Sequence, residues 1–250
     1  MQRYFIKLAF KGTLYHGWQI QDNALSVQGE LNDALSKVLG QKIETMGCGR
    51  TDTGVHAKNF YAHFDNIEEI SDTEKTIYKV NRILSNDIVC YELYQVDLNA
   101  HARFDAISRT YEYYIRRYKN PFLTETSYYF SGDLNLNLMN QACLILYNHI
   151  DFSCFSKSNT QVFTNNCKII NAFWQEKDDT LIFTIKADRF LRNMVRAIVG
   201  TLLEIGREKI TLENFNEIIL GKNRSNAGYS VPASGLFLTK IDYPKGLLNE

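Results

Sequence analysis

The stretch from Gly47 to Ala57, GCGRTDTGVHA, holds residue types that could perform chemistry, because it places an Arg, an Asp and a His among three glycines. Glycine adopts backbone angles closed to other residues, and without a Cβ it lets a polynucleotide backbone or base approach closely. Arg50 and Asp52 lie two apart, so in an extended segment both point to the same side. A nearby guanidinium keeps a carboxylate ionised, as a nucleophile or base requires. The loop is a candidate active site, and the alternative is a tight turn with a surface ion pair.

The same loop does not indicate a metal or a nucleotide cofactor. Asp52 and His56 are four residues apart and could share a metal only in a helix, which the glycines disfavour, and no further ligand lies near. The chain also has neither G-x-x-x-x-G-K-[ST] nor G-x-G-x-x-G. We therefore expect chemistry without metal or cofactor.

Composition indicates a globular protein. The 250 residues are 45% hydrophobic and 22% charged. The five cysteines are widely spaced without a C-x-x-C pair, so neither a disulfide framework nor a zinc site is predicted. No signal region and no apolar run of ~20 residues is visible, so we expect a soluble cytoplasmic protein without a membrane partner. The cysteines are Cys48, Cys90, Cys143, Cys154 and Cys167.

Charge and aromatic content bear on nucleic-acid binding. The formal net charge is zero, but residues 1–105 hold 11 Lys and Arg against 14 Asp and Glu, whereas residues 106–250 hold 17 against 14. A phosphate-binding surface is therefore expected mainly in the second half. The 15 Tyr and 15 Phe residues supply core packing or stacking platforms for unpaired bases.

Hydrophobic periodicity predicts an α+β fold in two halves. In the first half we expect a β-α-β-β-α-β order, the split βαβ arrangement, with strands at 3–10, 43–48, 60–64 and 88–96. A loop, GTLYHGWQIQD, should follow the first strand. We expect one helix that Ser26 caps and that runs to Leu39 before Gly40 stops it, and a second helix after a capping box at Ser71–Glu74. In the second half we expect strands at 108–117, 168–175, 181–187 and 236–241, with a hairpin around Lys177-Asp178-Asp179 between the second and third of them. We also expect helices at 136–147, 190–205 and 211–220, the last of them capped by Thr211. Arg189, Arg192 and Arg196 would share a face of the helix at 190–205.

Four spaced motifs carry a resemblance to a known family. GRTDTGVHA is followed by AHARFDAISRTYEY, then by FLRNMVRAIVG, and finally by ASGLFLTKIDYP. In this order they resemble the TruA family of tRNA pseudouridine synthases, over nearly the whole chain. The resemblance implies two ferredoxin-like halves, 1–105 and 106–250, whose antiparallel sheets form a central cleft in a homodimer. It also implies isomerisation of uridine to pseudouridine at positions 38, 39 and 40 of the tRNA anticodon arm, without cofactor or metal.

The resemblance assigns roles residue by residue. Asp52 is the catalytic aspartate, and either attacks the sugar or removes a proton from it, two routes that the sequence leaves open. Tyr111 would stack on the flipped-out uracil, with a core tyrosine as the alternative. Arg196 would pair with Asp52, and Arg50 would contact phosphate or position the Asp. Leu236 would form an apolar wall over the uracil, and the alternative is that it only packs in the core.

The HARF segment is implied to bind RNA and to help turn the base out; it consists of His101, Ala102, Arg103 and Phe104. One departure is visible: Asn59-Phe60 stands where family members commonly have Gly-Gln, which puts the polar contacts of that glutamine in doubt. Cys48 is expected to be a buried filler, and His56 a loop-packing residue.

Two other classes of function compete with the enzyme. The first is an RNA-binding or chaperone module with RRM-like sheets, whose aromatic residues fit although the typical strand motif is absent. The second is metal-dependent RNA cleavage. A chelator would stop metal-dependent cleavage but not the isomerase. Formation of pseudouridine in tRNA would distinguish the isomerase from the RNA-binding module.

Overall fold

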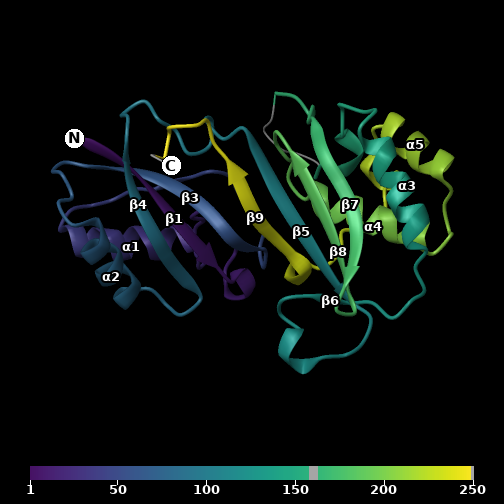
Figure 1. Ribbon diagram of the computed structural model, residues 1–250, viewed down its shortest axis with the longest axis horizontal. Helices are drawn as coiled ribbons and strands as arrows, with labels where there is room; N and C mark the ends of the chain where they lie inside the picture. Colours follow the sequence, from purple (N-terminus) through teal and green to yellow (C-terminus); the bar gives the residue numbers. More distant parts are fainter. Residues whose placement is uncertain (158–162, 249–250) are drawn as a thin grey trace. The chain divides into compact units, whose positions relative to one another are not determined.

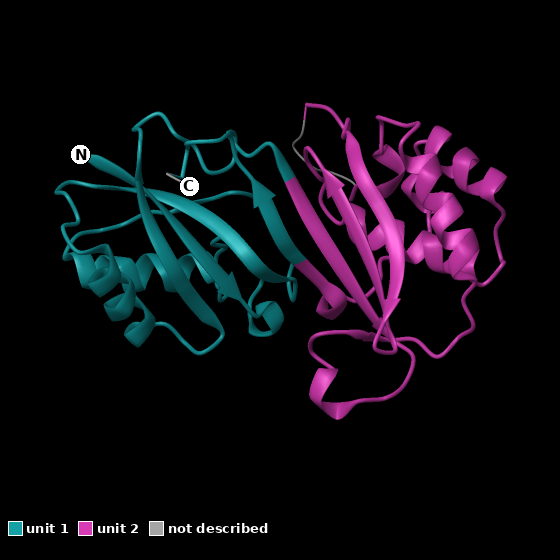
Figure 2. Cartoon of the chain, viewed as in Figure 1, with its two compact units in different colours: residues 1–108, 238–250 teal, residues 109–237 magenta. Residues whose placement is uncertain are grey.

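The computed structural model describes residues 1–157 and 163–248, which fall into two compact units (Figure 2). Unit 1 contains residues 1–108 and the C-terminal residues from Leu238 onward, and unit 2 contains residues 109–237. The last strand, β9 (Leu236–Asp242), therefore starts in unit 2 and ends in unit 1. Both units combine mostly antiparallel strands with helices, which confirms the expected α+β class.

Unit 1 is built on a sheet whose middle strand, β1 (Gln2–Phe10), pairs antiparallel with β3 (His56–Asn66) and β4 (Ile88–Val96) (Figure 1). The short strand β2 (Met46–Gly47) also pairs antiparallel with β3. The order β4-β1-β3-β2 is the split βαβ arrangement that the sequence predicts for this half. The unit 1 residues of β9 follow β3 in the strand order.

Two helices, α1 (Val27–Leu39) and α2 (Thr73–Ile83), lie side by side in unit 1 (Figure 1). The Ser26 hydroxyl caps α1 by accepting a hydrogen bond from a first-turn N–H, and Gly40 ends the helix in the left-handed conformation. Both boundaries of α1 are confirmed as the sequence predicts them. The buried side chains of α1 are Val27, Leu31, Ala34 and Leu35.

Other boundaries in unit 1 differ from the expected ones. Asp72, and not Ser71, caps α2, and its carboxylate accepts from the Lys75 N–H at 2.8 Å. The strand expected at 43–48 is reduced to the two residues of β2, whereas the strand expected at 60–64 is part of the eleven-residue β3. Because β3 starts at His56, the motif around Asp52 runs directly into a long central strand.

The sheet of unit 2 has the order β5-β8-β7, with β5 (Ser108–Arg116), β7 (Ile169–Lys177) and β8 (Thr180–Ala187) antiparallel. The two-residue strand β6 (Tyr128–Tyr129) pairs parallel with β5. The hairpin expected between β7 and β8 is confirmed, and it turns through Asp178–Asp179, both at positive φ.

Three helices accompany this sheet: α3 (Leu136–Leu146), α4 (Met194–Gly206) and α5 (Leu212–Leu220) (Figure 1). α3 packs on β7 and on α4, and α4 also contacts α5. Thr211 caps α5, as predicted, and the structure adds the reciprocal hydrogen bond of a capping box.

The start of α4 corrects one prediction. The helix begins at Met194, not at Phe190, because Asn193 before it has the left-handed φ of 67° and cannot continue a right-handed helix. Arg189 and Arg192 therefore precede α4, and the shared helical face predicted for them with Arg196 is wrong.

The five cysteines are buried, and none of them forms a disulfide with another in the part of the chain that the structure describes. Within residues 1–157 and 163–248, no helix has the length and apolar character needed to span a bilayer.

Candidate active site

The loop that carries Asp52 joins β2 to β3 and is closed by backbone hydrogen bonds at both ends. The Cys48 N–H donates to the Tyr61 carbonyl on β3 at 2.8 Å, and the Val55 N–H donates to the Asp52 carbonyl at 3.1 Å. Gly54, inside the turn, has the left-handed φ of 79°. Asp52 therefore lies on a tight turn anchored to the strand that follows it.

A second segment, residues 12–17, packs against the backbone of this loop. A Cβ built on Gly12 would lie 2.0 Å from the Val55 carbonyl oxygen, and one built on Gly17 would lie 2.2 Å from the Thr51 carbonyl oxygen. Only glycine permits so close an approach, and Gly17 also has φ 88°. The sequence predicts only a loop here, although two glycines between a strand and a helix are a signal of such close backbone contact.

His56 is a structural residue, as predicted. It is buried, and its Nδ1 accepts a hydrogen bond from the Gly12 N–H at 3.0 Å, which ties the end of the Asp52 loop to the supporting segment. An Nδ1 that accepts carries no proton, so the ring does not serve as a cation there. The described residues contain no group of three His, Cys, Asp or Glu side chains that could hold a metal ion.

Asp52 is half-buried, whereas Arg50 is exposed. The carboxylate is thus partly shielded from water and sits on a backbone that the supporting segment fixes, which suits a nucleophile or base that must be held in one position. Exposure of the Arg50 guanidinium suits contact with a phosphate of a bound polynucleotide. Cys48 is 1% exposed and fills space beneath the loop, as expected.

The HARF segment lies in a second loop of unit 1, between β4 and β5. The Asp105 carboxylate accepts from the His101 N–H at 2.7 Å, and the Asp105 N–H donates to the His101 carbonyl at 3.0 Å, so the loop is closed on itself. Ala102 is fully buried, while the Phe104 side chain is 74% exposed and the Arg103 guanidinium lies 5.6 Å from its ring centroid. The buried Ala102 thus anchors a loop that exposes the Arg103 guanidinium and the Phe104 ring to solvent.

The tyrosines of β5 have different environments. Tyr113 is fully buried, and its hydroxyl donates to the Pro232 carbonyl at 2.8 Å, so it is a core residue. Tyr111 is half-buried, and the Phe190 ring meets it edge to face with centroids 5.1 Å apart. Of the two rings, only that of Tyr111 is partly exposed, as a ring that stacks on a base has to be.

Arg196 is held in place on the first turns of α4. Its Nε donates to the Val231 carbonyl at 2.7 Å, and the Val231 N–H donates back to the Arg196 carbonyl at 3.3 Å. The helix and this segment approach closely, since a Cβ on Gly200 would lie 1.8 Å from the Tyr229 carbonyl oxygen. The guanidinium therefore has an orientation fixed by tertiary structure.

Leu236 opens β9 and is 5% exposed. The preceding Gly235 lies against the Tyr113 ring, because a Cβ there would be 2.7 Å from its Cζ. Leu236 is thus a mostly buried apolar residue of unit 2, in keeping with both of its predicted roles.

The departure at Asn59-Phe60 has a structural consequence. Phe60 is fully buried in the core of unit 1, with ring centroids 4.3 Å from Trp18 and 5.4 Å from Phe10. The Asn59 Oδ1 is buried without a hydrogen-bond partner in the described part of the chain. At this position the chain has an aromatic core residue, so the polar contacts of a glutamine do not come from Phe60.

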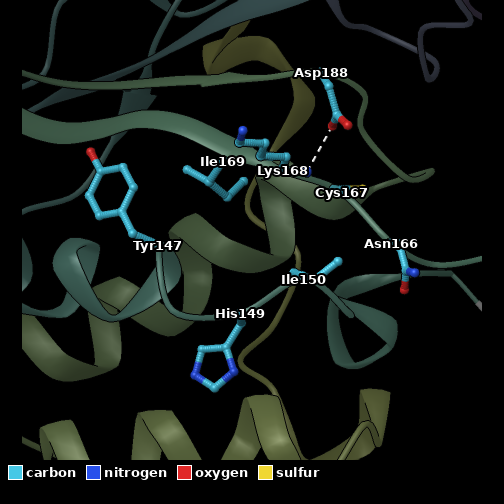
Figure 3. Close-up of a pocket in the computed structure, with 8 residues that line it drawn as sticks. All are labelled: Tyr147, His149, Ile150, Asn166, Cys167, Lys168, Ile169 and Asp188. Carbon is cyan, nitrogen blue, oxygen red and sulfur yellow. Dashed lines mark hydrogen bonds between the residues drawn. The ribbon is translucent and has the colours of Figure 1, made fainter.

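Unit 2 also contains a pocket of about 400 Å³, shown in Figure 3. The Asp188 carboxylate at its rim accepts from the Lys168 N–H at 2.8 Å, and the His149 Nε2 is 2.8 Å from Asn216 Oδ1. None of the predicted site residues belongs to its lining, which consists of Tyr147, His149, Ile150, Asn166, Cys167, Lys168, Ile169 and Asp188.

The predicted residues divide between the units. Unit 1 brings Arg50 and Asp52 into one loop and the HARF residues into another, and unit 2 carries Tyr111, Arg196 and Leu236. The pairing of Arg196 with Asp52 stays a prediction.

Comparison with known proteins identifies relatives along the whole chain. A family model described as tRNA pseudouridine synthase matches residues 149–244. The tRNA pseudouridine synthase A of Bacteroides thetaiotaomicron is 51% identical over 253 residues, covering 100% of this chain and 94% of the relative. That of Bacteroides fragilis is 51% identical and covers 98% of each chain, and that of Clostridium acetobutylicum is 38% identical and covers 97% of this chain and 100% of its own. The chain therefore belongs to the tRNA pseudouridine synthase A family.

Proposed function

We propose that the protein is an enzyme that isomerises uridine to pseudouridine in tRNA, at positions 38, 39 and 40 of the anticodon arm, without metal or cofactor. The observation that supports this most directly is the Asp52 loop, a fixed turn with a half-buried carboxylate, in a chain whose relatives over its full length are named tRNA pseudouridine synthase A.

The reaction explains why one carboxylate is needed. The bond between the ribose C1′ and the uracil N1 breaks, and a bond from C1′ to C5 of the same uracil forms. N1 gains a proton and C5 loses one, so the product is an isomer of the substrate. Asp52 serves this exchange either by attacking C1′, which gives a covalent adduct, or by removing the proton on C2′, which gives a glycal. In both routes the carboxylate must be ionised and fixed beside the sugar.

The remaining residues hold the substrate in this proposal. Tyr111 stacks on the uracil that has been turned out of the RNA, and Leu236 contributes an apolar wall. Arg196 supplies a fixed positive charge, which its bond to the Val231 carbonyl supports. Arg50 contacts the RNA backbone.

His101, Ala102, Arg103 and Phe104 form the RNA-contacting loop, which helps to turn the base out. The exposed Phe104 ring can take the place of a base in the stack, and Arg103 can neutralise a phosphate. The buried Ala102 and the half-buried His101 anchor the loop.

The decisive test compares Asp52→Asn with the wild-type protein on tRNA that carries uridine in the anticodon arm, with carbodiimide-based mapping of pseudouridine. Asp52→Asn should abolish product and leave tRNA binding within about twofold, because the amide preserves the shape but cannot attack or take a proton. Asp33→Asn is the control, since Asp33 is an exposed residue of α1 that pairs with Lys37. Product formation by Asp52→Asn would overturn the assigned role.

The RNA-binding module is the competing outcome of the same experiment. The exposed Phe104 and Arg103 suit such a module equally well. If wild-type protein binds the tRNA but forms no pseudouridine, the result supports an RNA-binding module without catalysis. If chelator stops a reaction of the RNA, metal-dependent cleavage stands.

We further propose that the enzyme works in the cytoplasm as a homodimer, on the strength of the resemblance. Light scattering of the purified protein at micromolar concentration tests the dimer, for which we expect about twice the chain mass of 28.9 kDa.

A further inference from the structure

The peptide of Ala102, in the middle of the RNA-contacting loop, is held from both sides by side chains that are distant in sequence. The buried Ala102 N–H donates to the Nδ1 of His63 on β3 at 3.1 Å. The Ala102 carbonyl accepts from the Tyr243 hydroxyl at 2.5 Å. His63 and Tyr243 both contact the Phe5 ring, with centroids 5.9 and 5.6 Å away, so they share one aromatic cluster of unit 1.

A second imidazole continues this arrangement toward the loop tip. The His101 ring lies 4.6 Å from the His63 ring, edge to face. The His101 Nδ1 accepts from the Arg103 N–H at 3.1 Å and from the Phe104 N–H at 3.3 Å. The two imidazoles thus bind three successive backbone N–H groups, the last two belonging to the residues that face solvent.

This arrangement requires neutral rings, because each Nδ1 accepts hydrogen bonds. Burial lowers the pKa of His63 to about 4, with further lowering from the neighbouring His101 and Arg3 and a smaller opposing effect of Asp65 and Asp105. Burial also lowers the pKa of His101, against an opposing effect of Asp105. Near neutral pH both rings are therefore uncharged acceptors.

We propose that His63 is a positioning residue of the RNA-contacting loop, which holds the Ala102 peptide so that Arg103 and Phe104 point toward bound tRNA. His63 itself is 7% exposed and binds the Ala102 N–H, so it acts through the loop. The proposal rests on the proposed function, since it takes tRNA as the ligand of the loop.

Two substitutions of similar size separate the hydrogen bond from simple packing. Asn places its Oδ1 where His63 has its Nδ1 and can accept from the Ala102 N–H, whereas Leu fills the space without an acceptor. His63→Leu should weaken tRNA binding and raise KM about tenfold, because a buried N–H loses its partner, and should leave kcat within about twofold. His63→Asn should stay within about threefold of wild type in both measurements.

A double-mutant cycle with Phe104→Ala tests whether His63 affects tRNA binding through the position of Phe104. If His63 acts by placing Phe104, the pair His63→Leu and Phe104→Ala should weaken binding by clearly less than the product of the two single effects. Equal losses in His63→Leu and His63→Asn, or single effects that multiply, would overturn the proposal. Should His63→Leu not fold, Tyr243→Phe removes the other hydrogen bond of the same peptide and takes its place in the cycle.

Amide hydrogen exchange supplies a readout that does not depend on activity. The Ala102 and Arg103 amides should exchange about tenfold faster in His63→Leu than in wild type and His63→Asn. Unchanged exchange would refute the positioning role. A wild-type protein that forms no pseudouridine would refute the proposed function and leave this exchange result intact.

Discussion

Gly17 offers a single-methyl test of whether the Asp52 loop depends on the segment behind it. In Gly17→Ala the new Cβ would meet the Thr51 carbonyl oxygen at 2.2 Å, and reaching the 3.4 Å of ordinary contact requires a shift of about 1.2 Å. Because the obstacle is backbone, and not the end of a flexible side chain, the loop itself has to move. A misplacement of about 1 Å near the reacting groups lowers a rate on the order of 100-fold.

The substitution also strains the backbone, because alanine at φ 88° costs about 1–2 kcal/mol. Gly40→Ala is the matched control for this strain. Gly40 has φ 69°, but nothing lies within 4 Å of its Cβ position. Gly17→Ala should lose more stability than Gly40→Ala in urea denaturation, because the overlap with the Thr51 carbonyl adds to the same backbone strain, and only Gly17→Ala should lose activity.

The assay is pseudouridine formation on tRNA under single-turnover conditions, with tRNA binding measured in parallel. For Gly17→Ala we expect a rate about 100-fold lower and binding within about threefold of wild type, since the displaced loop carries Asp52, which serves the chemical step. A Gly17→Ala protein that is folded and as fast as Gly40→Ala would refute the reasoning, because the loop would then tolerate displacement.

Two further predictions concern stability. Tyr113→Phe should lower the free energy of unfolding by about 1 kcal/mol, since the hydroxyl that donates to the Pro232 carbonyl is lost, and a change below about 0.3 kcal/mol in urea denaturation would contradict this. The hydrogen bond from Arg3 lowers the pKa of Asp65, so this pair stabilises the fold fully above the ordinary Asp pKa of 3.8, and the contribution is lost as pH falls through the lowered value. The difference in unfolding free energy between wild type and Asp65→Asn, about 1 kcal/mol after solvent screening, should be constant from about pH 5 to 7 and shrink below about pH 4, whereas a difference that grows toward acid would refute the assignment.

Elements whose signals are local were predictable from the sequence. The helix α1 was predicted from its cap at Ser26 to its stop at Gly40, because capping and left-handed termination depend on a few consecutive residues. The hairpin between β7 and β8 was predicted for the same reason, through its Asp178–Asp179 turn.

Elements whose limits depend on distant partners could not be predicted from the sequence. The apolar pattern of α4 continues backward to Phe190, but Asn193, whose side chain donates to the Ser230 hydroxyl, adopts a left-handed conformation and delays the helix. β2 is limited to Met46 and Gly47, which pair in register with His63 and Ala62 of β3, although the Cys48 N–H also donates to the Tyr61 carbonyl. The C-terminal residues from Leu238 onward belong to unit 1, which no local pattern indicates.

The sequence by itself determined the family, the α+β class and the Asp52 loop, because these follow from residue types at fixed spacings. Only the tertiary structure decided what holds the loops that carry the site. Gly17 lies far from Thr51 in the chain, and Tyr243 is 141 residues from the Ala102 carbonyl that it binds. Such contacts leave no periodic trace in the sequence, since close approach and hydrogen bonding depend on positions in space that the whole fold sets.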